Sequence, residues 1–102
     1  MDQSHPKPVA DERILVARLR SRSGYISEIH ILDLSVGGCL IVKRALPIKV
    51  DDRVFVSLPD LRFLPAQVAW IEEDEAALAF EEPLYEPVVE NLQRKFVTVR
   101  RD

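Results

Sequence analysis

The densest group of residues that could do chemistry is the hexapeptide DLSVGG at positions 33–38, between two apolar runs. Asp33 and Ser35 can hydrogen-bond backbone groups a residue or two ahead, and Gly37 and Gly38 allow positive φ or a close approach to the main chain. Such a turn presents a carboxylate, a hydroxyl and backbone N–H groups in one small concavity, which could bind a polar ligand. Most clusters of this kind only reverse the chain, so these residues alone favour a structural turn.

Four arginines near the N-terminus supply the positive charge that an anionic ligand would need. They are Arg13, Arg18, Arg20 and Arg22. From Ile14 onward apolar and other residues alternate as in a strand, which places Arg18, Arg20 and Arg22 on one face. That face could look toward the hexapeptide, but the solvated outer face of an amphipathic strand is the favoured interpretation.

The mild net charge of −3 conceals an uneven distribution along the chain. Residues 63–93 carry eight acidic side chains and no lysine or arginine. This half of the surface would repel nucleic-acid phosphates, so the sequence argues against binding of DNA or RNA. It leaves room for a small anionic ligand at the arginine-rich end.

Several classes of function are disfavoured by what the sequence lacks. A single cysteine cannot form an internal disulfide, and no cysteines and histidines have the spacing of a zinc site. No nucleophile has an obvious activating base, so an enzyme is not expected. No run approaches the roughly 20 apolar residues of a membrane span, and no apolar signal segment opens the chain. We therefore expect a cytoplasmic binding protein without a metal or another cofactor.

Alternating patterns separated by turn residues predict an all-β domain. Six strands are expected, at residues 14–22, 25–32, 39–42, 53–58, 63–71 and 76–80. One face of the fifth strand carries Leu64, Ala66, Val68 and Trp70. Trp70 and Phe80 are therefore expected to be core residues and not a platform on which bases stack. Short strands at this spacing are typical of an antiparallel sandwich or barrel.

The C-terminal segment changes from a period of two to a helical period. Pro87 suits the first turn of a helix. The apolar residues that recur at helical spacing are Val88, Val89, Leu92 and Phe96. The spacing predicts a helix at about residues 86–97 that lies on the barrel.

The length of 102 residues is enough for one hydrophobic core and too short for two. Pro6 and Pro8 stand among polar neighbours, so residues 1–12 are expected to form a flexible arm. The barrel domain, with its helix, is expected at residues 13–98. Residues 99–102 are expected to form a short tail.

The order of these features resembles the PilZ domain family. An arginine-bearing segment and a hairpin precede DLSVGG, and a short apolar strand, the segments AQVAW and ALAF and a terminal helix follow it. The family signature Asp/Asn-x-Ser-x-x-Gly is matched by Asp33, Ser35 and Gly38, and the similarity extends from about Arg13 to Phe96. The resemblance implies a six-stranded antiparallel β-barrel of the split-barrel type with one C-terminal α-helix. Many members of the family bind cyclic di-GMP, a bacterial second messenger, so the resemblance also implies binding of this nucleotide.

The other family signature, Arg-x-x-x-Arg before the first strand, is incomplete in this chain. Arg13 stands where the second arginine is expected, and Val9 stands four residues earlier. By resemblance, Arg13 would contact a phosphate or a guanine, while Asp33 and Ser35 would bond a guanine edge. The ligand-binding candidates are Arg13, Asp33, Ser35, Gly37 and Gly38, with Lys7 and Arg18 as further candidates.

Two functions of different classes stay open at this point. The first is a cyclic di-GMP receptor that passes its signal to an effector protein, whose identity the sequence does not give. The second is a divergent PilZ domain that binds no nucleotide and acts as a protein–protein interaction module.

Overall fold

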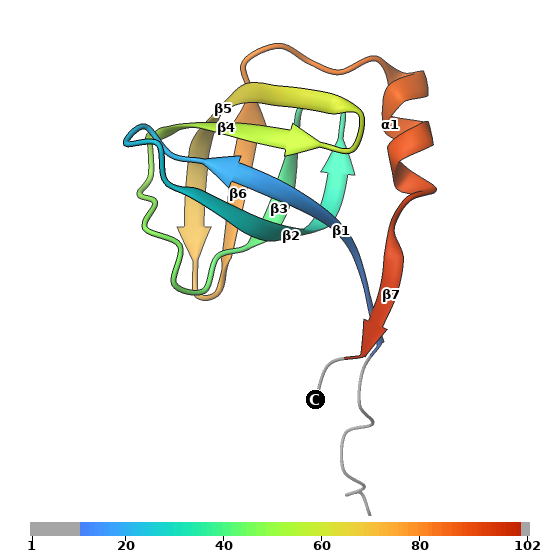
Figure 1. Cartoon of the computed structure of the whole chain (residues 1–102), viewed down its shortest axis with the longest axis horizontal. Helices are drawn as coiled ribbons and strands as arrows, with labels where there is room; N and C mark the ends of the chain where they lie inside the picture. Colours follow the sequence, from blue (N-terminus) through green and yellow to red (C-terminus); the bar gives the residue numbers. More distant parts are fainter. Residues whose placement is uncertain (1–10, 101–102) are drawn as a thin grey trace, which may run out of the picture.

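The strands of this protein close into an antiparallel barrel (Figure 1). The computed structural model describes residues 11–100. The barrel strands are β1 (Asp11–Arg20), β2 (Ile26–Ser35), β3 (Gly38–Val42), β4 (Arg53–Leu58), β5 (Leu61–Glu72) and β6 (Glu75–Phe80). They follow the order β1-β2-β3-β6-β5-β4, and the pairing of β1 with both β2 and β4 closes the ring. The expected six-stranded antiparallel barrel is confirmed.

The inner faces of the strands form a continuous apolar core. Along β1, for example, Leu15, Ala17 and Leu19 are buried, as the alternation of the sequence predicts. Leu46 and Ile48, from the loop between β3 and β4, belong to the same core. Burial of one such leucine or isoleucine contributes about 1.5–3 kcal/mol, so this face accounts for much of the stability of the domain.

The pairing register shifts at three places in the barrel wall, and two of these shifts are β-bulges that position residues of the site. One lies between Ile31 and Asp33, opposite β3, and the other between Val68 and Trp70, opposite β6. Ile31 and Val68 are fully buried, so an unbroken alternation would turn the second residue after each of them inward. The additional residue in each bulge instead turns Asp33 and Trp70 outward.

The core position expected for Trp70 is therefore wrong, because 42% of its surface is exposed. The bulge in β5 shifts the alternation by one residue just before the indole. The same expectation for Phe80, which follows a regular part of β6, is confirmed: it is 8% exposed.

The C-terminal helix is shorter than expected and is followed by a seventh strand. Helix α1 (Glu86–Gln93) packs Val89 and Leu92 into the core. Strand β7 (Val97–Arg100) then pairs with the first four residues of β1, beyond the barrel. In Figure 1, α1 and β7 descend one after the other along the side of the molecule to the start of β1.

The pairing of β1 with β7 explains both differences from the expected boundaries. The apolar spacing continues to Phe96, but the sequence Val-Thr-Val at 97–99 is rich in β-branched residues, which favour a strand where an open edge is available. The start of β1 at Asp11 provides that edge. The expected helix end at 97 and the tail from 99 are thus wrong. The arm expected at residues 1–12 lies, up to residue 10, outside the described residues.

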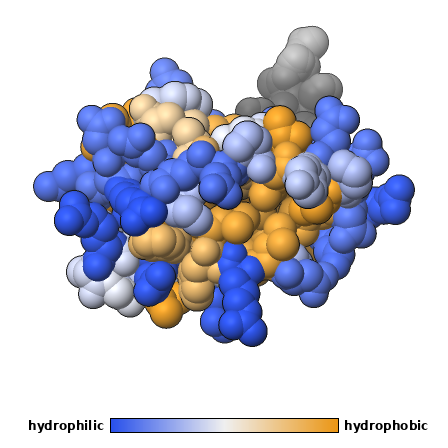
Figure 2. Space-filling model, turned by 90° about the horizontal axis from the view of Figure 1, so that it is seen from above, coloured by the Kyte–Doolittle hydropathy of each residue, from blue (hydrophilic) through white to orange (hydrophobic). Residues whose placement is uncertain are grey.

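Apolar side chains also gather on the outside of the barrel, toward the side of α1. Figure 2, which views the molecule from above, shows them surrounded by hydrophilic side chains. On this side, Pro59, Leu61, Pro87 and Val88 line a small hollow between the β4–β5 turn and the helix. None of the helices in residues 11–100 is long and apolar enough to cross a membrane.

The thiol of Cys39 on β3 is buried, and burial raises its pKa from 9.0 to about 12. An unfolded thiol loses its proton near pH 9.0, so between these values the native state binds one proton more than the unfolded state. The free energy of unfolding should therefore fall as the pH rises through this window. Between about pH 9.5 and 10.5, denaturant unfolding should show this fall to be about 1 kcal/mol smaller in Cys39→Ala than in the wild type. Equal slopes for the two proteins would contradict a buried, protonated thiol.

Candidate functional site

The hexapeptide at 33–38 forms the end of β2, a two-residue turn and the first residue of β3. Ser35 and Gly38 face each other across this hairpin, and the Ser35 hydroxyl donates to the Gly38 carbonyl oxygen at 3.3 Å. The turn is also tied to the end of β6. The Phe80 N–H donates to the Gly37 carbonyl oxygen at 2.9 Å, and the Leu84 N–H donates to that of Val36 at 2.8 Å. The hexapeptide is thus a fixed hairpin turn.

The two glycines have different roles from those first expected. Among the glycines, only Gly24 has a positive φ, so Gly37 and Gly38 do not use the positive φ that glycine allows. The backbone of Gly38 is closely approached, as expected, but by another part of the protein and not by a ligand. A Cβ atom at Gly38 would lie 2.1 Å from the carbonyl oxygen of Leu78, whereas one at Gly37 would meet no atom within 4 Å. The backbone of β6 occupies the space that Gly38 leaves free.

The carboxylate of Asp33 lies exposed beside this turn. Oδ1 accepts a hydrogen bond from the N–H of Leu34 at 3.0 Å, which orients the side chain. Oδ2 has no hydrogen-bonding or ionic partner within the described part of the chain. A carboxylate that is held by one oxygen and open at the other can accept hydrogen bonds from a ligand.

Arg13 and Asp33 line one hollow of about 280 Å³ together with Leu32, Gln93 and Phe96. Arg13 stands on the part of β1 that pairs with β7, outside the barrel. Its Nη2 donates to the carbonyl oxygen of Gln93 at 3.3 Å, and its guanidinium lies over the ring of Phe96 at 5.6 Å from the centroid. The fold therefore brings Arg13, the candidate arginine of the first signature, to Asp33 of the second.

Gln93 connects the end of the helix to both sides of this hollow. Its side-chain Nε2 donates to the carbonyl oxygen of Leu34 at 3.2 Å, while its backbone carbonyl accepts from Arg13. The last residue of α1 thus joins the hexapeptide and the arginine. Residues 11–14 of β1 are positioned by β7, so the strand that the sequence did not predict helps to place Arg13.

A second hollow of about 440 Å³ adjoins the first, with Asp33 in the lining of both. Its lining includes Asp33, Ser35, Gly37, Gly38 and Trp70, and the outward-facing alanines Ala69, Ala77 and Ala79. The short side chains of the alanines form a shallow depression. The half-exposed indole of Trp70 can stack on a flat ring. The combination offers a carboxylate, a hydroxyl and an aromatic wall on a shallow apolar floor.

The other arginines of β1 are not brought to this place. Arg18 lines a different hollow, with Glu28 and Pro59. The guanidinium of Arg20 lies over the rings of Phe55 and Phe63, at 4.6 and 5.1 Å from their centroids. Of the candidates from the sequence, the structure gathers Arg13, Asp33, Ser35, Gly37 and Gly38, and it leaves Arg18 apart. Lys7 lies outside the described residues.

Three further residues of the site were not found from the sequence. They are Trp70, Gln93 and Phe96. The outward position of Trp70 depends on a bulge that no sequence pattern marks, and the helix was expected to continue past Gln93. Within residues 11–100, no group of three or more histidine, cysteine or acidic side chains could hold a metal ion.

Comparison with known proteins agrees with this architecture. The model of the PilZ domain family matches residues 12–96, so the chain belongs to this family. The solved PilZ domain of CeSA from a cellulose-synthesizing bacterium is similar, with a TM-score of 0.54, 17% identity and coverage of 87% of this chain and 90% of that one. At this identity the likeness shows the fold alone. Comparison with curated proteins gave no match.

Replacement of Gly38 by alanine should destabilise the barrel, because the added methyl group would collide with the backbone oxygen of Leu78. The expected loss is about 2 kcal/mol or more in the free energy of unfolding. Gly37→Ala provides a matched control in the same turn, since its methyl group enters open space, and should change stability by less than about 0.5 kcal/mol. Urea unfolding of both variants measures the difference. Similar losses in the two proteins would refute the packing role of Gly38.

Proposed function

We propose that this PilZ domain binds cyclic di-GMP at the two adjoining hollows and passes the signal to an effector protein. The observation that carries the proposal is the shared position of Asp33, which joins the hollow of Arg13 to the hollow of Ser35 and Trp70. The complete Asp-x-Ser-x-x-Gly signature and the one candidate arginine of the incomplete signature thereby line two hollows that share Asp33. Family membership supplies the class of ligand.

The chemistry of these groups suits a guanine nucleotide. The open Oδ2 of Asp33 can accept hydrogen bonds from the N–H groups of a guanine, and the low floor beside Gly38 lets a flat base lie against the wall. The indole of Trp70 can stack on that base, which typically contributes about 1–3 kcal/mol. Arg13 can donate either to a phosphate or to the O6 and N7 acceptors of a guanine.

A protein–protein interaction module without a nucleotide is the second candidate, and one observation favours it. The guanidinium of Arg13 is already engaged by the carbonyl oxygen of Gln93 and the ring of Phe96. The sequence offers Val9 in place of a second arginine, and Arg18 and Arg20 belong to other surroundings. In this alternative, Arg13 would only fasten β1 to the end of the helix.

Isothermal titration calorimetry with cyclic di-GMP separates the two candidates. The wild type should bind cyclic di-GMP with a dissociation constant of about one to tens of micromolar. Asp33→Ala should weaken binding about tenfold or more, because it removes a charge-assisted hydrogen bond worth about 1.5–3 kcal/mol. Arg13→Ala should weaken binding by less, up to about tenfold, because Arg13 gives up its contacts with Gln93 and Phe96 to reach the ligand. Arg18→Ala is the matched control and should bind as the wild type does. The absence of heat with the wild type in this range would exclude the receptor function.

The only tryptophan of the chain, Trp70, should report on the same event. A base that stacks on the half-exposed indole displaces water and changes the fluorescence of the ring. We expect a saturable change with the same midpoint as the calorimetric titration, shifted in Arg13→Ala by the same factor. GTP at twice the concentration, which supplies the same amount of guanine, serves as the control for absorption by the base. Calorimetric binding without any change at Trp70 would place the ligand elsewhere.

A further inference from the structure

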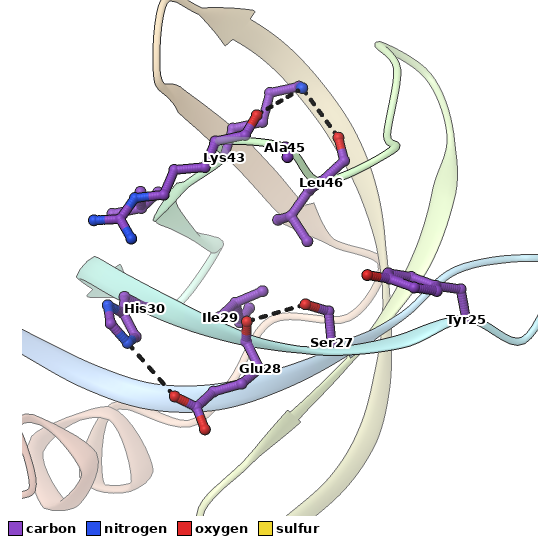
Figure 3. A pocket seen from close by; sticks show the side chains of 10 residues that line it. Tyr25, Ser27, Glu28, Ile29, His30, Lys43, Ala45 and Leu46 are labelled. Atoms are coloured by element: carbon purple, nitrogen blue, oxygen red, sulfur yellow. Dashed lines mark hydrogen bonds and ion pairs between the residues drawn. The ribbon is translucent and has the colours of Figure 1, made fainter.

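The barrel wall has an opening at the half of β2 that is remote from the hexapeptide. β2 pairs with β1 from Ile26 to Ile31, but it pairs with β3 only from Ile31 onward. On the β3 side, therefore, no strand of the described residues lies beside residues 27–30. A hollow of about 410 Å³ fills this gap, and the loop at residues 43–46 forms its opposite side (Figure 3).

The loop across the gap is held in place by several hydrogen bonds. The N–H of Lys43 donates to the carbonyl oxygen of Asp74 at 2.7 Å, and the N–H of Leu46 donates to that of Lys43 at 2.9 Å. The Lys43 ammonium also donates to the carbonyl oxygens of Arg44 and Leu46, at 3.4 and 3.0 Å. Leu46 is anchored in the core. The loop therefore has a fixed conformation and forms an ordered wall of the hollow beside β2.

The surfaces of the hollow combine an apolar floor with hydrogen-bonding groups. Ile29, Val42 and Leu46 are buried side chains at its base. Figure 3 shows the Tyr25 hydroxyl directed into the space between β2 and the loop, and the Ser27 hydroxyl bonded to the carbonyl oxygen of Glu28. That bond has a length of 3.2 Å. Because no strand of the described residues pairs with residues 27–30 on this side, the edge of β2 can offer backbone groups to an incoming chain.

The rim of the hollow carries one cation without a partner. Among residues 11–100, the guanidinium of Arg44 has no hydrogen bond and no ion pair. Arg44 also has a φ of 44°, a conformation that is uncommon for a residue with a side chain. The one acidic side chain in the lining of the hollow, Glu28, is turned away from the loop toward His30, with 3.6 Å between Oε2 and Nε2 (Figure 3). The rim thus favours a carboxylate.

We propose that this hollow binds an extended acidic segment of a partner protein, which adds as a strand beside residues 27–30 of β2. Backbone hydrogen bonds to an open strand edge provide sequence-independent affinity, and side-chain pockets provide selectivity. A carboxylate of the segment pairs with Arg44, and an apolar side chain next to it enters the floor over Ile29 and Leu46. A lone small anion would satisfy Arg44 but neither the strand edge nor the floor. The proposal does not depend on nucleotide binding, because none of these residues lines the hollows around Asp33.

Peptide selection tests the proposal directly. Phage that display random nonapeptides are selected on the immobilised wild-type protein, and the enriched peptides are synthesised. They should carry Asp or Glu within an alternating apolar pattern. Fluorescence anisotropy should show binding to the wild type that is about tenfold or more weaker in Arg44→Glu, because an attractive ion pair becomes repulsive. Arg62→Glu, an exposed arginine on β5, is the matched charge-reversal control and should bind normally.

Two further measurements establish the binding mode. A peptide in which lysine replaces the acidic residue should bind Arg44→Glu better than it binds the wild type, since the charges are then exchanged. Amide hydrogen exchange should slow at residues 27–30 when the selected peptide is bound. The proposal is overturned if no acidic peptide is enriched, if Arg44→Glu binds the peptides equally well, or if the protection appears elsewhere. It is also overturned if N-acetylglutamate alone binds as tightly as the peptide.

Discussion

The β-bulges before Asp33 and before Trp70 are the constraint on which the candidate site depends. Asp33 and Trp70 each follow a fully buried residue by two positions, so an unbroken alternation would bury both. Burial of an unpaired carboxylate costs several kcal/mol, and the indole would have to fit a core that is already filled. The bulges remove both conflicts and turn the two side chains onto one outer surface. Local irregularity of the sheet thus creates the surface of the candidate site.

A second constraint is the close contact between β3 and β6 at Gly38. The absence of a side chain there lets the carbonyl oxygen of Leu78 approach, which brings the outward alanines of β6 next to the hexapeptide. The glycine of the family signature therefore acts in this chain through the packing of the barrel. It shapes the floor of the hollow, and a bound ligand would benefit from it only indirectly.

Period-2 alternation predicted the six strands because it directly reflects one buried face. It left a sandwich and a barrel open, and the closed barrel was implied by the family resemblance. The sequence could not predict the bulges, which depend on how two paired strands fit each other, and Trp70 was therefore assigned to the core. The end of the helix was missed for a similar reason. Phe96 continues the helical spacing, but the next residues find an open edge at Asp11–Ile14, which only the tertiary structure reveals. The proximity of Arg13 to Asp33 followed from the family resemblance and from no local pattern.

The surroundings of Arg13 determine how nucleotide binding would affect the rest of the molecule. To reach a ligand, its guanidinium must leave the Gln93 carbonyl oxygen, a bond worth about 1 kcal/mol, and the Phe96 ring, worth about 0.5–1 kcal/mol. A charge-assisted hydrogen bond from Arg13 to a phosphate contributes about 1.5–3 kcal/mol. The net gain from Arg13 is thus small, and most of the affinity would come from Asp33 and Trp70. The same exchange would remove the side-chain bond between Arg13 and the end of α1, while the backbone pairing of β1 with β7 would remain. By reciprocity, a partner that binds α1 more tightly while Arg13 contacts Gln93 would weaken nucleotide binding by the factor by which the nucleotide weakens binding of that partner.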